Sequence, residues 1–377
     1  MNIEQKLGPR LKALREARQL SQDQLAPVYG VNDRQTVSQI ETGNRRLSAV
    51  ELVRVAQFFG VSLDDLSNPF LLGSSKASFS WRQTGVRTAD LNSFELRAGE
   101  WIGAYRELSG ATGQRLRTIL PRVGLTYQSS YEDAIRAGED VALEFDLGDV
   151  PARRLAETME RELGILVLMV EAIQGVSGAA CRLPELNVVL INRHESEVRR
   201  HFDLAHELFH ILTWDTMPPE RVECAEPGEA KIAPATARER RLARIEQLAN
   251  NFAAGVLMPG PALDKLGAPH GDLVVWLDAA AAILGVSGPA LKYRLLNAGR
   301  IAAEAKRIPD SALIQVARER QLPPPPVPFG ESFLKTIAKA IEGGHLSARR
   351  AAGLLDTTTD DLGAWCDALK IGRPAEL

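Results

Sequence analysis

Two histidines four residues apart, His206 and His210, have the spacing in this sequence that is best suited to chemistry. On a helix, residues four apart lie on the same face, so both imidazoles can bind one Zn²⁺ ion. Glu207 completes the pattern HExxH, in which the glutamate is the general base and the metal lowers the pKa of the water that attacks. The pattern predicts a hydrolytic zinc centre, with Mn²⁺ as the alternative metal. The competing interpretation is a pair of surface histidines on an amphipathic helix.

A catalytic zinc ion needs a third protein ligand and one open coordination position. Glu246 lies in the largely apolar segment IEQLANNFAAGVLM, where a buried carboxylate is costly unless it is paired or bound to metal. Asn250, four residues later on the same helical face, is expected to support the site by hydrogen bonding. From the residues alone, Glu246 is equally compatible with a solvated flank of the helix. The other downstream candidates include Asp215, Glu220, Glu223, Glu226, Glu229 and Glu239.

The elements that must position these residues predict an α+β domain. A helix is expected over 152–163, followed by the apolar strand ILVLMVEA, a glycine-rich turn and a second strand over 185–192. The histidine helix follows, and after a polar stretch a long helix ends at Pro259. We expect the long helix to pack beneath the histidine helix. We also expect the second strand to offer a free edge to an extended peptide.

The segments SGAACRLPELNVVLINRHESEVRRHFDLAHELFHIL and EQLANNFAAGVLMP together resemble the ImmA/IrrE family of metallopeptidases, over about residues 149–300. The resemblance implies a zincin-like α+β domain with a small sheet. It further implies that His206, His210 and Glu246 are the zinc ligands and that Glu207 is the base. The sequence departs from the family at Asp203, where threonine is usual, so an extra carboxylate is expected near the start of the histidine helix.

Residues 1–66 have the pattern of five short helices joined by tight turns. Ser21 and Gln24 form a predicted capping box that opens the second helix, and RQTVSQIE is predicted to form the third. The segment from Leu20 to Leu66 resembles the Xre/Cro repressor family of helix-turn-helix proteins, with one extra residue in the turn VNDRQ.

That resemblance implies an all-α DNA-binding domain whose third helix enters the major groove. Base contacts are expected from residues on or near this helix, namely Gln35, Thr36, Ser38 and Gln39. Phosphate contacts are expected from Gln22, Arg34, Arg45 and Arg46. Residues 1–66 carry nine Lys and Arg against eight Asp and Glu, so we expect binding to need a homodimer on a palindromic operator. The alternative is a five-helix protein–protein module.

Composition narrows the class of protein. The chain has 377 residues and a net charge of −3, which predicts two or three globular units and excludes a polycation that coats nucleic acid. Its three cysteines are far apart without a CxxC pair, which argues against a disulfide framework and fits a reducing cytoplasm. We expect no membrane segment, because no apolar run is long enough to span a bilayer.

Changes of pattern along the chain predict five regions. They are a helix-turn-helix domain (1–68), a linker and helical connecting region (69–150), the metallopeptidase domain (151–300), a helical segment with a proline-rich linker (301–328) and a small helical C-terminal region (329–377).

Combined, these features predict a cytoplasmic transcription regulator that binds double-stranded operator DNA. Its metallo-endopeptidase domain is expected to cleave a repressor or regulator protein in a stress, phage or mobile-element response. One alternative is a transcription factor whose peptidase-like domain only senses a ligand or mediates dimerisation. Another is an antitoxin-type autorepressor.

Overall fold

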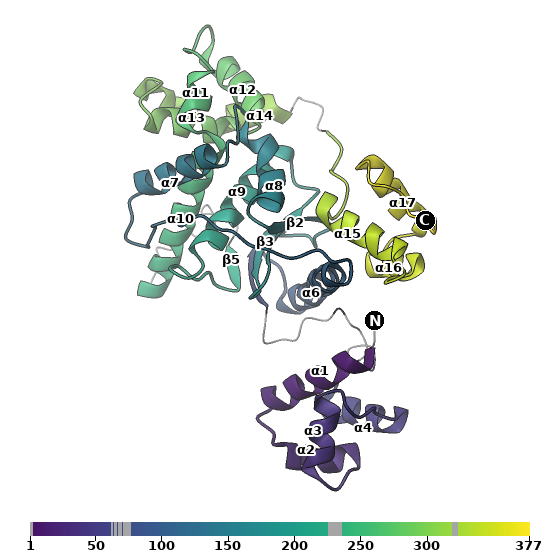
Figure 1. Ribbon diagram of the computed structural model, residues 1–377. Helices are drawn as coiled ribbons and strands as arrows, with labels where there is room; N and C mark the ends of the chain where they lie inside the picture. The colour runs from purple at the N-terminus through teal and green to yellow at the C-terminus, as the bar shows by residue number, and fades with distance from the viewer. Residues whose placement is uncertain are drawn as a thin grey trace.

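A computed structural model describes residues 3–61, 63, 66, 70, 77–224, 236–318 and 323–377. Figure 1 shows a small helical domain at the N-terminus and a larger part in which helices cover both faces of a sheet. The predicted α+β class is confirmed. Part of the linker at 67–75, most of the predicted fifth N-terminal helix, and Glu226 and Glu229 lie outside the described residues.

Four helices are described in the N-terminal domain, and local caps set where three of them begin. They are α1 (Ile3–Ala17), α2 (Gln22–Tyr29), α3 (Arg34–Glu41) and α4 (Ala49–Phe59). The predicted capping box of Ser21 and Gln24 is confirmed, and the Asp33 side chain caps α3. The helices close over a core that includes Leu11, Leu25, Val37, Ile40 and Phe59.

A mixed five-stranded sheet organises the larger part. Its strands are β1 (Ser78–Gln83), β2 (Ile165–Val170), β3 (Val176–Arg182), β4 (Asn187–Asn192) and β5 (Val222–Cys224), in the order β2-β4-β3-β1-β5. β4 pairs parallel with β2 and antiparallel with β3. The predicted free edge on this strand is therefore wrong, because both sides of β4 are hydrogen-bonded.

The expected connecting region over 69–150 also needs correction. β1 pairs antiparallel with β3 and parallel with β5, so this segment supplies a strand of the central sheet. It also supplies α6 (Thr88–Ala111) and α7 (Tyr131–Glu144), which carry buried residues of the two cores beside the sheet. The part of the region that is described belongs to the sheet body.

Side chains that alternate along the strands supply two cores, one on each face of the sheet. Ile165, Val167 and Val189 face the core formed with α7, α8 (Pro151–Arg161), α9 (Glu197–Thr213) and α10 (Ala237–Leu257). Leu166 and Leu168 face the opposite core, formed with α6, α15 (Glu331–Glu342), α16 (Ala348–Leu354) and α17 (Thr359–Ala368). The C-terminal helices thus cover the face of the sheet opposite to α9.

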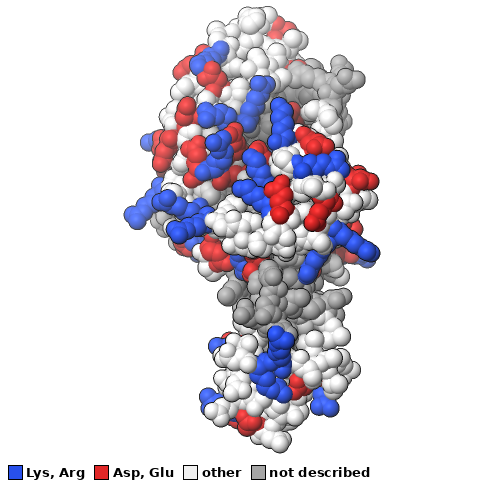
Figure 2. Space-filling view, turned by 45° about the vertical axis from the view of Figure 1, so that its right-hand side comes forward, with Lys and Arg blue, Asp and Glu red and all other residues white. Residues whose placement is uncertain are grey.

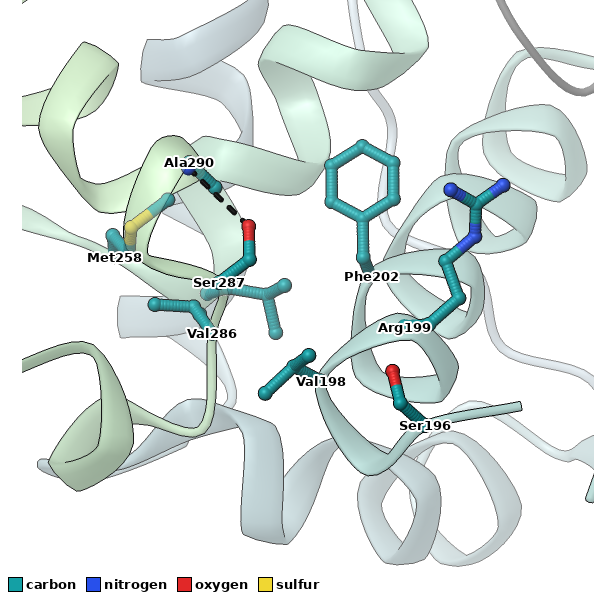
Figure 3. A pocket seen from close by; sticks show the side chains of 9 residues that line it. Ser196, Val198, Arg199, Phe202, Met258, Val286, Ser287 and Ala290 are labelled. Atoms are coloured by element: carbon teal, nitrogen blue, oxygen red, sulfur yellow. Dashed lines mark hydrogen bonds between the residues drawn. The ribbon is translucent and has the colours of Figure 1, made fainter. Parts of the chain in front are cut away.

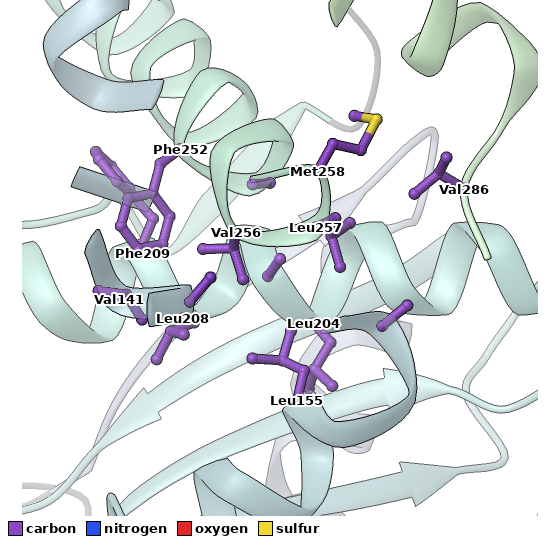
Figure 4. Packing of buried hydrophobic residues seen from close by; sticks show 14 of the residues in the cluster. Val141, Leu155, Leu204, Leu208, Phe209, Phe252, Val256, Leu257, Met258 and Val286 are labelled. Carbon is purple, nitrogen blue, oxygen red and sulfur yellow. The ribbon is translucent and has the colours of Figure 1, made fainter. Parts of the chain in front are cut away.

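Helix α10 packs on α9 and on α7 (Figure 4). The contact with α9 is the packing of the long helix on the histidine helix that the sequence predicted. The rings of Phe209 and Phe252 lie 5.6 Å apart between the two helices. On the α7 side, a Cβ added to Gly255 would lie 2.1 Å from the Ile135 carbonyl oxygen, so the close approach requires glycine. This packing fixes the position of α10 relative to the histidine helix.

Small helices follow α10 and complete this side of the molecule. They are α11 (Gly260–Asp264), α12 (Leu273–Leu284), α13 (Gly288–Asn297), the 3₁₀ helix η1 (Ala303–Arg307) and α14 (Asp310–Arg318). Within the described residues, no single helix has both the length and the apolar composition to cross a membrane. In the described part of the chain, α12 and α13 meet that test when they are taken together, and they bend by 100° at the break between them.

Candidate metal centre and DNA-binding surface

Helix α9 carries His206, Glu207 and His210, and all three side chains are fully buried. The Nε2 atoms of His206 and His210 lie 3.1 Å apart, as their spacing of one helical turn predicts. Two imidazoles that place their Nε2 atoms together in a buried site form half of a tetrahedral metal site.

Glu246 on α10 brings a carboxylate to the same point. Its Oε2 lies 3.3 Å from His206 Nε2, and its Oε1 lies 3.6 Å from His210 Nε2. Atoms bound at about 2.1 Å to one tetrahedral zinc ion lie about 3.4 Å from each other, so the three side chains fit zinc. Burial raises the pKa of Glu246, although the charges of His210 and Arg82 act in the opposite direction.

Asn250 fixes the orientation of the first histidine. Its Oδ1 lies 3.0 Å from His206 Nδ1, one turn along α10 from Glu246. An amide oxygen at this distance accepts the Nδ1–H, which leaves the lone pair of the ring on Nε2. The imidazole is therefore held in the tautomer that binds a metal ion.

Glu207 is directed toward the sheet. A Cβ added to Gly178 of β3 would lie 3.7 Å from Glu207 Oε1 and 3.1 Å from the Leu190 carbonyl oxygen. The Glu207 carboxylate therefore lies against β3 at Gly178.

A buried ion-pair cluster lies one helical turn before Glu207. Asp203 is fully buried, and its Oδ1 accepts from Arg82 Nη1 at 2.9 Å. Its Oδ2 accepts from Arg199 Nε at 3.1 Å. Burial raises the pKa of Asp203, against the influence of the two arginines. The carboxylate that departs from the family pattern is thus paired on both oxygens.

Sequence reasoning missed Arg82, which comes from β1 and is itself buried. Asp203 was the available signal, because a carboxylate on the buried side of an active-site helix needs a cationic partner. The identity of that partner had no local signal, since Arg82 lies 121 residues away in the chain.

In the N-terminal domain, the predicted base-reading residues lie on α3. Gln35 and Gln39 are exposed, whereas Thr36 and Ser38 are half-buried. The Thr36 hydroxyl donates to Asp33 Oδ2 at 2.8 Å, which leaves its methyl group as the part suited to base contact. The first residue of α3 is Arg34, and the Asp33 side chain caps the helix.

The predicted phosphate-contacting residues do not all lie free on the surface. Gln22 donates to Glu41 at 2.9 Å and accepts from Arg34 Nε at 3.2 Å, which links the starts of α2 and α3. Arg45 is half-buried and pairs with Glu51 at 2.7 Å, whereas Arg46 is exposed. In Figure 2, Lys and Arg side chains gather on the visible face of this domain, while both signs mix over the larger part.

Comparison with known families agrees with both predicted domains. Residues 11–66 match the helix-turn-helix family model, and residues 161–296 match the model of peptidase family M78 described as IrrE N-terminal-like domain. The chain is a helix-turn-helix domain fused to an ImmA/IrrE-type domain. Arg82 lies outside the matched residues of the ImmA/IrrE-type domain, although its side chain enters the core of that domain.

Two solved structures align with most of the chain at low similarity. The apo form of the competence regulator ComR from Streptococcus vestibularis is 12% identical, with 91% of this chain and 99% of that chain covered and a TM-score of 0.17. PlcR from Bacillus thuringiensis, in complex with the peptide PapR7 and DNA, is 11% identical, with 97% and 99% covered and a TM-score of 0.16. No curated protein sequence matches the chain.

Three of the other carboxylates that the sequence offered as ligands are described, and each has another partner. Asp215 pairs with Arg182, Glu220 pairs with Arg238, and Glu239 caps α10 at Thr236. The side chain of Glu223 lies outside the described residues. Among the described His, Cys, Asp and Glu side chains, the group formed by His206, His210 and Glu246 could hold a metal ion.

Two further histidines, His194 and His201, lie away from this group. The ring of His194 contacts Glu171 at the surface. His201 Nδ1 lies 2.9 Å from the Gly285 carbonyl oxygen, and burial lowers the pKa of this imidazole.

Proposed function

We propose that this chain is a DNA-binding transcription regulator whose ImmA/IrrE-type domain is a zinc-dependent endopeptidase. Its substrate is a repressor or regulator protein, cleaved in a stress, phage or mobile-element response. The observation that carries the proposal is the convergence of His206, His210 and Glu246 beside Glu207. This donor set leaves a fourth tetrahedral position for the reacting groups.

Each side chain of the centre has a defined task in peptide hydrolysis. His206, His210 and Glu246 would hold zinc, which supplies Lewis acidity toward water and the peptide carbonyl. Glu207 accepts a proton from the attacking water and returns it to the leaving amine. Asn250 keeps His206 in its metal-binding tautomer.

The metal assignment can be tested without a substrate. We expect one divalent metal ion per purified chain, and loss of that metal in His206→Ala and in Glu246→Ala. Glu239→Gln on the same helix is the matched control, because glutamine preserves the capping interaction with Thr236. Full metal content of Glu246→Ala by elemental analysis would remove Glu246 from the site.

The hydrolytic role depends on Glu207. Glu207→Gln should retain the metal and lose cleavage of candidate repressors by about 10²–10⁴-fold, the usual contribution of a general base. Glu197→Gln, an exposed change on the same helix, should cleave normally. Fragments are mapped by mass spectrometry, and equal rates for the two variants would refute the mechanism.

The DNA-binding role rests on the exposed side chains of α3 and on the family match. We propose a homodimer that binds a palindromic operator near its own promoter, with affinity that falls steeply with salt. Gln39→Ala should relax base preference, whereas Arg46→Ala should weaken binding to all sequences alike. Footprinting with the full-length protein tests this, and no protection of that promoter would favour a protein–protein module.

A further inference from the structure

An apolar pocket lies along α9 from the metal centre. Its volume is about 380 Å³, and it is bounded by the first turns of α9, the end of α10 and the loop between α12 and α13 (Figure 3). Val198, Phe202, Leu257, Met258 and Val286 supply most of its wall. Pockets of this size and composition take small apolar ligands or parts of larger ones.

Phe202 connects this pocket to the metal centre. It lines the pocket and lies one helical turn before His206, and the two ring centroids are 6.1 Å apart. Its other neighbour is Arg82, whose guanidinium carbon lies 5.6 Å from the ring centroid. When a polypeptide binds across the metal ligands, one of its side chains close to the reacting bond can therefore reach the pocket.

The pocket wall is held in place by hydrogen bonds. His201 on α9 contacts the carbonyl of Gly285, which joins α9 to the loop on the far side of the pocket. Gly285 has a φ of +66°, so the turn that presents Val286 depends on glycine. Ser287 caps α13 by accepting from the Ala290 amide at 3.3 Å. These contacts preorganise the pocket, which reduces the ordering cost of binding.

The charges at the pocket select against basic side chains. Among the described lining residues, Arg199 carries the charge, and its guanidinium is tethered to Asp203. A lysine or arginine in the pocket would lose its hydration and meet a like charge.

We propose that this pocket binds a large apolar side chain of the protein substrate, such as leucine, isoleucine, methionine or phenylalanine, beside the bond that is cleaved. The proposal rests on the endopeptidase function proposed above and adds its specificity. Preference for such a side chain over glycine or alanine should be at least tenfold, because each methylene in an apolar pocket contributes about 10–200-fold to discrimination.

The test is a digest of a random-sequence peptide mixture by the zinc-loaded full-length protein, with cleavage sites mapped by mass spectrometry. We expect large apolar residues to be enriched, and lysine and arginine to be depleted, at one position next to the cut. Ala290→Phe fills the pocket and should reduce this enrichment at least tenfold in favour of glycine, alanine and serine. Ala282→Phe is the matched control, because Ala282 is exposed on α12 and does not line the pocket. Ala290→Leu is the milder second variant should phenylalanine impair folding.

A binding measurement gives a readout independent of turnover. On the Glu207→Gln background, the best-cleaved peptide should bind at least tenfold more tightly with leucine than with glycine at the selected position, and Ala290→Phe should remove the difference. An unchanged profile for Ala290→Phe, or no apolar preference in the wild type, overturns the pocket assignment and leaves the peptidase standing. Complete absence of cleavage by the wild type overturns the proposed function, and this inference with it.

Discussion

His206 has a separate task for each of its two ring nitrogens. Nε2 lies among the metal-ligand atoms of His210 and Glu246, and Nδ1 contacts Asn250. A histidine whose outer nitrogen is engaged in this way is oriented and made more basic as a ligand. We therefore expect Asn250 to contribute to metal affinity without touching the metal.

Asn250→Ala should weaken metal binding by about 10–100-fold while the protein stays folded, because removal of such an outer partner typically costs that much. Competition with a chromophoric chelator measures the affinity. The control is Asn251→Ala, since Asn251 donates to the Gln247 carbonyl of its own helix. Equal metal affinities of the two variants would show that Asn250 does not orient His206.

At the scale of elements, α9 joins the metal centre to the sheet through Asp203. This carboxylate compensates the charge of Arg82 from β1 and also contacts Arg199 of its own helix. Removal of one partner from a buried ion pair leaves an uncompensated charge, which is far more costly than loss of a surface pair. The cluster thus ties a strand from outside the family-matched residues to the helix that carries the ligands.

Asp203→Asn should destabilise the protein by about 3–5 kcal/mol, because it removes the charge of a buried carboxylate that pairs with the buried Arg82. Urea unfolding followed by tryptophan fluorescence is suitable, since all five tryptophans lie beyond residue 80. Asp215→Asn, which breaks the largely exposed pair with Arg182, should cost at most about 1 kcal/mol. A similar, small loss in both variants would mean that the buried cluster contributes little.

Glu160 on α8 gives the larger part a pH dependence. Its Oε2 accepts from Ser332 of α15 at 2.7 Å, its Oε1 accepts from the Val167 amide of β2 at 3.3 Å, and burial raises its pKa to about 7. The folded state holds the proton of the Glu160 carboxyl group more tightly than the unfolded state does. The stabilisation of the folded state by this protonated group is therefore complete below about pH 4.5. It is lost as the pH rises through about 7.

The expected loss between pH 5 and 7.5 is at most about 3 kcal/mol of unfolding free energy. Glu160→Gln removes the titration, so the difference in unfolding free energy between wild type and variant should change with pH over this window. Glu157→Gln, an exposed change on the same helix, should follow the wild type. Parallel curves for wild type and Glu160→Gln would exclude this residue as the cause.

Across the whole molecule, features set by neighbouring residues could be predicted from the sequence. The capping box at Ser21 and the facing imidazoles of His206 and His210 both depend on spacings of three or four residues. Glu246 needed the family resemblance, because its approach depends on how α10 packs on α9. The two domains that make up the fusion could therefore be recognised from the sequence.

Features that depend on distant pairing could not be predicted in the same way. The segment VSGAACR has the small residues of a turn, yet it forms the central strand β3 because β1 and β4 pair with it on both sides. SFSWRQ likewise forms the strand β1 because it pairs with β3 and β5. Arg82 was missed for the same reason, since its place beside Asp203 follows from the register of β1.

The proposed peptidase centre and the proposed DNA-binding surface belong to different domains of the molecule. If proteolysis is the switch, Glu207→Gln should bind operator DNA as the wild type does, because Glu207 lies in α9 and the residues proposed to read DNA lie in α3. In cells it should leave the target regulator intact and its genes uninduced. Glu197→Gln on the same helix should respond normally. A domain that only senses a ligand needs no proton acceptor at position 207, so it would still switch its promoter in the Glu207→Gln strain. Reporter expression and immunoblots of the target, measured in the same cultures under the inducing stress, therefore decide between the peptidase and the sensor.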